Sequence, residues 1–295
     1  MRLFIFGFGF SAGFIAQRLL GRGWTVAGTA RREAARADLA RRGVTPIDPG
    51  DRDALTAELA KADAVLVSAP PDSLGCPGYN SLRPLIEEAA LRPDFIGYLS
   101  TTGVYGDREG GWVNETSELL APSPEGGRRV AAEAHWRAFC TEHGLPLAIF
   151  RLPGIYGPGR SPFERLRSGS ARRFDKPGQV FSRIHVEDLA EGVIAALRRP
   201  RLDAIYNLCD DRPCSASEVT EYAASLIGLD PPPLIPWQDA EMEPQARRFY
   251  AESKRISNAR AKAELGWRPL YPTYREGLAA VLAAVLAAEQ ASVSP

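Results

Sequence analysis

The sequence predicts an α/β fold: a doubly wound, parallel sheet of about seven strands with a small C-terminal subdomain. Short apolar runs alternate with helix-length segments through the first half of the 295 residues, and this alternation is typical of parallel strands joined by crossover helices. From residue 156 onward proline and glycine become frequent and the helical segments become short. With 45% hydrophobic and 24% charged residues, the composition is that of a globular protein with a substantial core.

Seven runs of apolar and β-branched residues are the expected strands. The fourth and sixth runs, AVLVS and LAIFRL, are almost entirely apolar, as expected for strands buried on both faces of a sheet. In chain order the runs span residues 3–6, 24–29, 44–47, 64–68, 95–100, 147–152 and 205–208. Helical patterns lie between them, including 53–60 and 128–143. An alanine-rich stretch at 278–288 predicts a terminal helix that is too short to span a bilayer.

The first strand ends in a glycine-rich turn, GFGFSA at residues 7–12, and a helical stretch and a second strand follow. This order of strand, turn, helix and strand is the context in which such a pattern binds a dinucleotide. Gly7 permits the tight turn, Gly9 lets a pyrophosphate approach the main chain, and Ala12 is small enough for close packing. The helix start supplies amide N–H groups and positive dipole to phosphates. A glycine-rich turn without a ligand is the alternative. The expected contacts are Gly7, Gly9, Phe10 and Ser11.

Two arginines after the second strand bear on the identity of the coenzyme. NAD sites usually place a carboxylate there to hold the ribose 2′-hydroxyl, but Thr29 is followed by Ala30, Arg31 and Arg32, with no acid before Glu33. A guanidinium can bind a 2′-phosphate through paired charged hydrogen bonds, whereas a carboxylate would repel it. We therefore expect NADP rather than NAD, with Arg31 and Arg32 as contacts. The alternative is that both residues only begin a solvated helix.

These features divide the chain into two expected parts. Residues 1–155 form an NADP-binding Rossmann core, which a strand near 204–208 completes. Residues 156–295 form mainly a substrate-side region and the C-terminal helix.

Charge and cysteine content argue against several classes of function. The 36 Lys and Arg residues balance 36 Asp and Glu residues, so no overall charge attracts nucleic acid or an anionic membrane. The four cysteines show no Cys-x-x-Cys spacing, and no His, Cys and carboxylate cluster has metal-ligand spacing, so we expect reduced thiols and no metal. The first strand begins directly after Met1, which leaves no room for a cleaved signal peptide. We expect a cytoplasmic protein that acts on a small molecule.

Four later motifs together resemble those of one protein family. They are LSTTGVYG at 99–106, RLPGIYGPGR at 151–160, IHVEDLA at 184–190 and LGWRP at 265–269. In this order they resemble motifs of the extended short-chain dehydrogenase/reductases, a family that includes sugar-nucleotide epimerases and dehydratases. The second resembles the family's loop beneath the nicotinamide. The resemblance implies an NAD(P)-dependent enzyme, and a homodimer through the helices that flank the fifth strand.

The family's catalytic Tyr-x-x-x-Lys pair is missing where the resemblance places it. No Tyr-x-x-x-Lys lies between residues 106 and 152, and counting back from Glu133 puts Glu125 and Arg129 at the two positions. The family's tyrosine moves a proton at the substrate oxygen. Arg129 can hold ribose hydroxyls but cannot release a proton near neutral pH. Glu125 can act as a base, and as an acid only if burial raises its pKa. The chain thus resembles an atypical branch that keeps the cofactor site.

Four other side chains are candidates for the catalytic chemistry. Thr101 occupies the family's substrate-orienting position after the fifth strand, with a hydroxyl that caps its own turn as the alternative. Tyr105 and Tyr156 are candidate replacement phenols in loops beside the crevice, and buried tyrosines with satisfied hydroxyls are the alternative. His185 titrates near physiological pH and can relay a proton. A packing or capping histidine is the competing interpretation of that residue.

Further residues are expected to contact the cofactor or an anionic substrate. Asp48 or Asp51, after the third strand, is expected to meet the adenine amino group. Arg160, Arg183 and Arg247 fall where the family places phosphate- or carboxylate-binding groups, so their convergence would imply an anionic substrate, and solvated surface arginines are the alternative. The other expected cofactor contacts are Ser68, Ala69, Pro70, Ser100 and Pro153.

Two functional hypotheses follow. The first is an NADP-dependent oxidoreductase or epimerase/dehydratase-like enzyme that acts on a small, anionic or sugar-type carbonyl or hydroxyl compound. Hydride transfer belongs to the cofactor, and the protein supplies orientation and a proton. The second is a protein that binds NADP without turning it over and signals its redox state. The missing Tyr-x-x-x-Lys favours the second hypothesis, and the Thr101 position with the substrate-side motifs favours the first.

Overall fold

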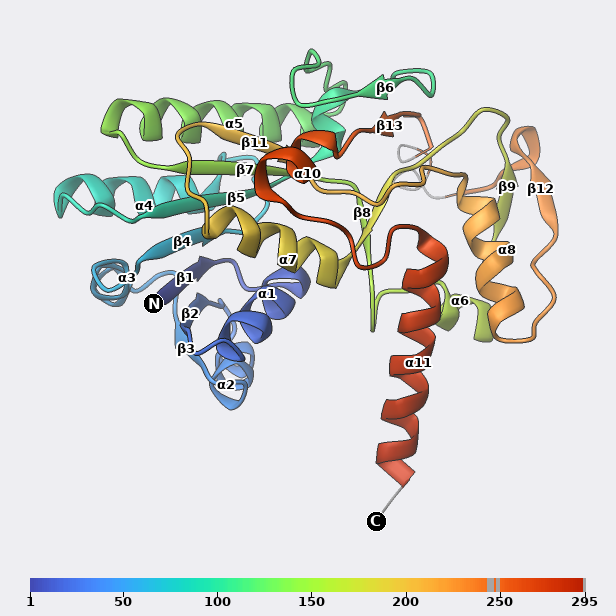
Figure 1. Ribbon diagram of the computed structural model, residues 1–295, viewed down its shortest axis with the longest axis horizontal. Coiled ribbons are helices and arrows are strands. Elements are labelled where there is room, and N and C mark those ends of the chain that lie inside the picture. The colour runs from blue at the N-terminus through green and yellow to red at the C-terminus, as the bar shows by residue number, and fades with distance from the viewer. Residues whose placement is uncertain (243–246, 248–249, 294–295) are drawn as a thin grey trace.

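The computed structural model describes residues 1–242, 247 and 250–293, with side chains described to residue 290. At its centre lies a seven-stranded sheet with the order β11-β7-β5-β4-β1-β2-β3, in which every neighbouring pair is parallel (Figure 1). The predicted doubly wound α/β fold is therefore confirmed. The strands are β1 (Arg2–Phe6), β2 (Thr25–Thr29), β3 (Val44–Ile47), β4 (Ala64–Val67), β5 (Phe95–Thr101), β7 (Leu147–Leu152) and β11 (Ala204–Asn207).

The strand order creates a switch point beside β1. From β1 the chain adds β2 and β3 on one side, and then returns to add β4, β5, β7 and β11 on the other. Ligands of such sheets bind outside the carboxyl ends of the strands where the order reverses. In this sheet the order reverses between β1 and β4, so the rule places the ligand crevice at the glycine turn that follows β1.

Helices cover both faces of the sheet, because successive residues of each strand point to opposite faces. Leu3 and Ile5 of β1 belong to the core under α1, α2 and α7, whereas Phe4 and Phe6 belong to the core under α3, α4 and α5. Figure 1 shows α4 and α5 on one side of the sheet and α1 and α7 on the other. The helices are α1 (Phe10–Leu20), α2 (Glu33–Arg41), α3 (Arg52–Leu59), α4 (Pro77–Glu88), α5 (Pro124–His143) and α7 (Val186–Leu197).

Local sequence explains where α5 begins and ends. The Ser123 hydroxyl accepts a hydrogen bond from the Gly126 amide, and Pro124 occupies the first helical position. Both features favour a helix start, so the helix begins before residue 128, the predicted start. Its end follows from Gly144, whose left-handed backbone (φ +63°) terminates the helix.

The later half builds a smaller lobe around a third hydrophobic core, which includes Tyr156, Phe163, Leu166, Tyr274 and Leu278. Figure 1 shows α6, α8 and α11 beside the sheet, with α11 running away from the body. The helices here are α6 (Phe163–Arg167), α8 (Ala216–Leu226), α10 (Ala259–Leu265) and α11 (Tyr274–Val293), with the 3-10 turns η1 (Thr102–Tyr105) and η2 (Trp237–Asp239).

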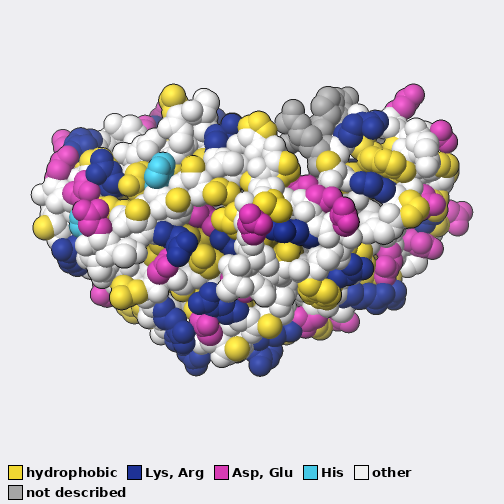
Figure 2. Space-filling model, turned by 90° about the horizontal axis from the view of Figure 1, so that it is seen from above, with side chains coloured by type: hydrophobic (Ala, Val, Ile, Leu, Met, Phe, Trp, Pro, Cys, Tyr) yellow, Lys and Arg dark blue, Asp and Glu magenta, His cyan; other side chains and the backbone are white. Residues whose placement is uncertain are grey.

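Outside the central sheet, the described residues form three two-stranded parallel pairs. They are β8 (Gly154–Tyr156) with β10 (Arg183–His185), β9 (Arg173–Asp175) with β12 (Leu234–Pro236), and β6 (Trp112–Val113) with β13 (Arg255–Ile256). None of the described helices combines the length and apolar character needed to cross a membrane. Basic and acidic side chains are interspersed on the face drawn in Figure 2.

Candidate functional site

The glycine turn after β1 is pressed against the end of β4. Gly7 adopts φ +88°, and a Cβ atom there would lie 2.6 Å from both the Cβ and the amide nitrogen of Ala69. The Gly7 amide donates to the Thr29 hydroxyl at 2.8 Å. The Ser68 and Ala69 amides both donate to the Phe6 carbonyl, at 2.9 and 3.2 Å. Only glycine fits this position, and Ser68, Ala69 and the exposed Pro70 line the same edge of the crevice.

The start of α1 offers main-chain donors. Gly9 is the exposed N-cap in extended conformation, no side chain caps the helix, and its first turn holds no acidic residue. A Cβ atom on Gly9 would have nothing within 4 Å. Ser11 is buried in the first turn, and half-buried Phe10 lies under the Arg160 guanidinium, 5.7 Å from the ring centre. Uncapped amide groups with open space before them fit a phosphate.

The residues after β2 and β3 divide into exposed and paired charges. Arg31 and Arg32 are exposed, and their side chains make no hydrogen bond or ion pair with the described residues. Asp48, expected at the adenine, lies 2.8 Å from the Arg36 guanidinium. Asp51 is the cap of α3, since its carboxylate accepts from the Ala54 amide at 2.9 Å. The glycine turn thus fits a dinucleotide, and two exposed arginines follow the adjacent strand β2.

At the carboxyl end of β5, Thr101 caps the turn that follows. Its hydroxyl accepts from the Gly103 amide at 3.1 Å, so the turn-capping alternative describes this contact, and the half-buried side chain lies at the crevice. Ser100 is buried and donates to the Glu133 carboxylate at 2.5 Å. The Ser100 hydroxyl is therefore occupied by a hydrogen bond inside the protein. Pro153 is half-buried between β7 and β8.

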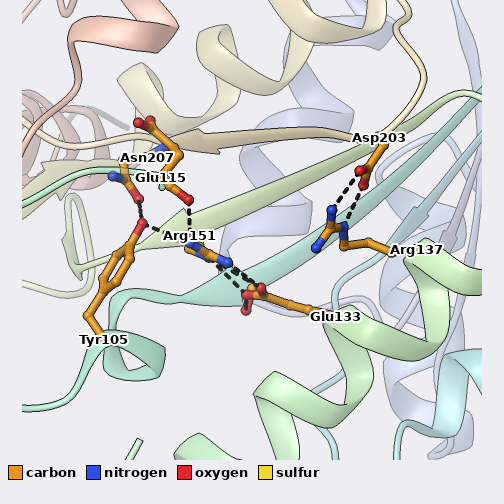
Figure 3. A network of polar contacts seen from close by, with 8 residues as sticks. Tyr105, Glu115, Glu133, Arg137, Arg151, Asp203 and Asn207 are labelled. Carbon is orange, nitrogen blue, oxygen red and sulfur yellow. Dashed lines mark hydrogen bonds and ion pairs between the residues drawn. The ribbon is translucent and has the colours of Figure 1, made fainter. Parts of the chain in front are cut away.

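A buried polar network joins the ends of β5, β7 and β11 beneath this crevice (Figure 3). Arg151 and Glu133, both 3% exposed at the side chain, form an ion pair at 2.8 Å. The Tyr105 hydroxyl donates to Asn207 at 2.7 Å and accepts from Arg151 at 3.1 Å. Burial raises the pKa of Tyr105 to about 12, although Arg151 opposes the rise. Tyr105 therefore matches the alternative of a buried tyrosine with a satisfied hydroxyl.

Glu125 and Arg129, the two positions that the family resemblance assigns to the catalytic pair, lie on the first turns of α5. Glu125 is exposed, and its carboxylate lies 3.6 Å from Arg128. Arg129 reaches back to β5, where it donates to the Leu99 carbonyl at 2.5 Å and lies over the Tyr98 ring. A Cβ atom on Gly126 would lie 3.3 Å from the Gly103 carbonyl. The first turn of α5 therefore packs closely against the turn that follows β5.

A cavity of 560 Å³ opens between β8, β10, α6 and α11. Arg160 and Arg183 both line it, so the structure brings two of the three expected arginines together. Arg165 also lines it and was missed by sequence reasoning, because nothing in its helix distinguishes it from a surface residue. Arg247 lies elsewhere: it donates to the Ala240 carbonyl at 3.0 Å and lies over the Trp237 ring. The convergence expected for all three is thus limited to Arg160 and Arg183.

His185 is the N-cap of α7. Its Nδ1 atom accepts from the Glu187 amide at 3.3 Å, whereas Nε2 is buried without a partner among the described residues. Burial, aided by the charge of Arg18, lowers the pKa of His185 to about 4, so the ring is neutral at physiological pH. Since Nδ1 is the acceptor, the proton resides on Nε2. The capping alternative for His185 is therefore the contact observed.

Two further buried groups follow from His185: Tyr156 lies beside it, and the charge of Asp210 acts on Tyr156. Tyr156 is the partner of His185 in the β8–β10 register, with ring centres 5.3 Å apart, and lines the cavity. The Tyr156 hydroxyl and Oδ2 of Asp210 have no partner among the described residues. Burial raises the pKa of Tyr156, and the charge of Asp210 adds to the rise. Sequence analysis did not identify Asp210 as a candidate. The pair of adjacent acidic residues, Asp210 and Asp211, was the only signal in this loop. Among the described residues no three His, Cys, Asp or Glu side chains gather as metal ligands.

Comparisons with known proteins agree with this geometry. The "NAD dependent epimerase/dehydratase family" matches residues 4–209. Protein YeeZ of Escherichia coli (strain K12) is 30% identical over 283 residues, which cover 91% of this chain and 95% of YeeZ. A solved structure from Silicibacter pomeroyi, titled as a functionally unknown conserved protein, is 44% identical with a TM-score of 0.90, covering 96% of this chain and 98% of that one.

The dTDP-glucose 4,6-dehydratase DesIV of Streptomyces venezuelae, solved with NAD and TYD bound, shares the fold. It is 21% identical with a TM-score of 0.79, and the match covers 96% of each chain. The family match spans the sheet and the glycine turn, and the likeness to YeeZ spans nearly the whole chain. The chain belongs to the NAD dependent epimerase/dehydratase family.

Proposed function

We propose that this protein is an NADP-dependent oxidoreductase or epimerase/dehydratase-like enzyme that acts on a small anionic or sugar-type carbonyl or hydroxyl compound. The observation that carries the proposal is the uncapped start of α1 behind Gly7 and Gly9, followed after β2 by two exposed arginines whose side chains have no ion pair among the described residues. The NAD bound in the DesIV structure, which shares this fold, supports a nicotinamide coenzyme.

The residues of the glycine turn would hold the coenzyme. Main-chain amides at the start of α1 bind the pyrophosphate, and the missing Cβ of Gly9 leaves room for its approach. Ala69 walls the adenosine half beside Gly7. Arg31 binds the 2′-phosphate, because a guanidinium forms paired charged hydrogen bonds with a phosphate. When bound, the nicotinamide ring supplies the hydride transfer.

The arginine-lined cavity supports an anionic substrate. Arg160 reaches both the cavity wall and the Phe10 ring at the start of α1, so it lies between the coenzyme turn and the substrate side. Arg183 lines the cavity over the Tyr274 ring. Three arginines, Arg160, Arg165 and Arg183, line the cavity together with one carboxylate, that of Glu164. This excess of positive charge favours a phosphate or carboxylate over an uncharged ligand.

Proton transfer falls to groups other than a Tyr-x-x-x-Lys pair. We assign orientation of the substrate oxygen to Thr101, whose hydroxyl hydrogen is left to donate while its oxygen accepts from Gly103. Glu125, an exposed carboxylate in the first turn of α5, serves as the base. Tyr156 stays protonated at neutral pH because burial raises its pKa, so it can donate but not accept a proton.

A second candidate is a protein that binds NADP without turnover and reports its redox state. The observation that favours it is the burial of Tyr105, whose hydroxyl is shared by Asn207 and Arg151 and is thus removed from proton chemistry. The two candidates differ in turnover and agree in coenzyme binding.

The test is a fluorescence titration with NADPH and NADH, followed by a screen of aldehydes, ketones and sugar nucleotides for coenzyme oxidation. The enzyme predicts NADPH oxidation with one carbonyl class, and tight binding without oxidation supports the sensor. Arg31→Ala should reduce the preference for NADPH by about 1–3 kcal/mol. Arg41→Ala, an exposed arginine at the far end of α2, is the matched control. An unchanged preference in Arg31→Ala would refute the 2′-phosphate assignment.

A further inference from the structure

Arg36 of α2 joins three segments at the edge of the coenzyme crevice. Its Nη1 atom donates to the carbonyl oxygens of Ala30 and Arg31, at 3.1 and 2.8 Å, and lies 2.8 Å from Oδ2 of Asp48. One guanidinium thus connects the turn after β2, the helix that follows and the loop after β3. Its side chain is only 25% exposed, which separates it from an ordinary surface arginine.

Asp48 lies directly beside the turn that carries Arg31. The β2–β3 register pairs Thr29 with Ile47, and the Ala30 amide donates to the Ile47 carbonyl at 3.0 Å. Asp48 is the next residue, and its Oδ1 accepts from the Gly50 amide at 2.9 Å, which fixes the carboxylate. An uncompensated carboxylate at this place would repel a 2′-phosphate.

Arg31 and Arg36 differ in how they are held. The exposed Arg31 side chain makes no contact with a described acceptor, whereas its carbonyl is held by Arg36. The free guanidinium therefore extends from a fixed point of the main chain. Fixing that point in advance reduces the ordering cost of binding an anion.

We propose that Arg36 is a positioning residue that sets the choice between NADPH and NADH. It fixes the main chain that carries Arg31, and it pairs Asp48 so that this carboxylate does not act on the 2′ position. Asp48 is then a partner of Arg36 rather than the adenine contact expected from the sequence. The inference rests on the proposed function, because it requires a coenzyme at this turn.

The experiment measures dissociation constants for NADPH and NADH by coenzyme fluorescence on the full chain and its variants. Arg36→Gln should raise the NADPH constant about tenfold and change the NADH constant by less than about twofold. Arg36→Lys, which keeps the charge and loses the planar guanidinium, should fall between Gln and the unchanged chain. Arg41→Gln is the matched control on the same helix, where an exposed ion pair with Asp38 is lost, and it should change neither constant by more than about twofold.

Combined variants separate the two parts of the mechanism. Adding Asp48→Asn to Arg36→Gln should restore part of the NADPH affinity, because no unpaired carboxylate remains. In the Asp48→Asn background, Arg36→Gln can remove only the hydrogen bonds that support the turn after β2. There, Arg36→Gln should weaken NADPH binding when Arg31 is present and have little effect when Arg31 is alanine.

The outcomes are distinct. If the chain prefers NADPH and Arg36→Gln leaves the ratio of the two constants unchanged, the inference fails and the proposed function stands. If Arg36→Gln weakens NADPH equally with and without Arg31, then Arg36 binds the phosphate itself and the positioning role is wrong. If the unchanged chain binds neither coenzyme, the proposed function fails, and this inference fails with it. Retained NADH binding in each variant shows that the variant is folded.

Discussion

Asp210→Asn should stabilise the protein more at alkaline than at acidic pH. Asp210 follows β11 and is 2% exposed. Its Oδ1 accepts only a long hydrogen bond, 3.4 Å, from the Arg212 amide, and Oδ2 has no partner among the described residues. Burial raises the pKa of Asp210 from 3.8 to about 7; Arg183 opposes the rise, and the charges of Asp211 and Asp188 add to it.

The sign and size follow from proton binding. Above about pH 4 the unfolded chain releases this proton while the native state keeps it, so the free energy of unfolding falls until about pH 7 and then levels off. From about pH 5 to about pH 8.5, pKa values of 3.8 and about 7 give a loss of roughly 2–3 kcal/mol. Asparagine has no proton to lose, so the variant avoids this loss.

Thermal unfolding of both proteins at about pH 5 and about pH 8.5 is the assay. At roughly 2 °C per kcal/mol for a chain of this size, the advantage of the variant in melting temperature should grow by about 5 °C. Asp53→Asn is the control: the side chain lies on α3 and is exposed to solvent, so the effect of this substitution on the melting temperature should be the same at both pH values. An advantage for Asp210→Asn that is constant, or larger at acidic pH, would refute the reasoning.

Three further predictions concern other parts of the site. Gly7→Ala should weaken coenzyme binding at least about tenfold, because its Cβ would lie 2.6 Å from Ala69 at φ +88°; unchanged affinity in a fluorescence titration would contradict this. Tyr105→Phe should lower the free energy of unfolding in urea by about 1–2 kcal/mol and spare coenzyme affinity, whereas an equally stable variant would show that its hydroxyl contributes nothing. Glu125→Gln should suppress turnover with coenzyme affinity nearly intact, because it removes the proposed base, and full activity would remove Glu125 from the proton path.

The fold and the coenzyme turn were accessible from the sequence because their determinants are local. Alternating apolar runs marked the strands, and the GFGFSA turn between a strand and a helix marked the crevice, where Gly7 meets Ala69. Helix ends were less accessible, since the start of α5 depends on Ser123 as a cap. Periodicity alone placed that start several residues late.

Side-chain partners were the part that sequence could not provide. The ion pair between Asp48 and Arg36 could not be predicted from the sequence, because it depends on how α2 packs beside β3. Tyr105 read as a candidate phenol, although its hydroxyl is shared with Asn207, which lies 102 residues away. The separation of Arg247 from Arg160 and Arg183 is likewise a matter of tertiary packing. Such contacts carry no signal in residue spacing.

A crystal structure of the full chain with NADPH tests the central claim most directly. The account predicts the pyrophosphate at the amides that begin α1, the 2′-phosphate within hydrogen-bond distance of Arg31, and Arg36 still bound to the Ala30 and Arg31 carbonyls. Coenzyme bound away from the turn at Gly7 and Gly9, or a 2′-phosphate that contacts neither arginine, would contradict it.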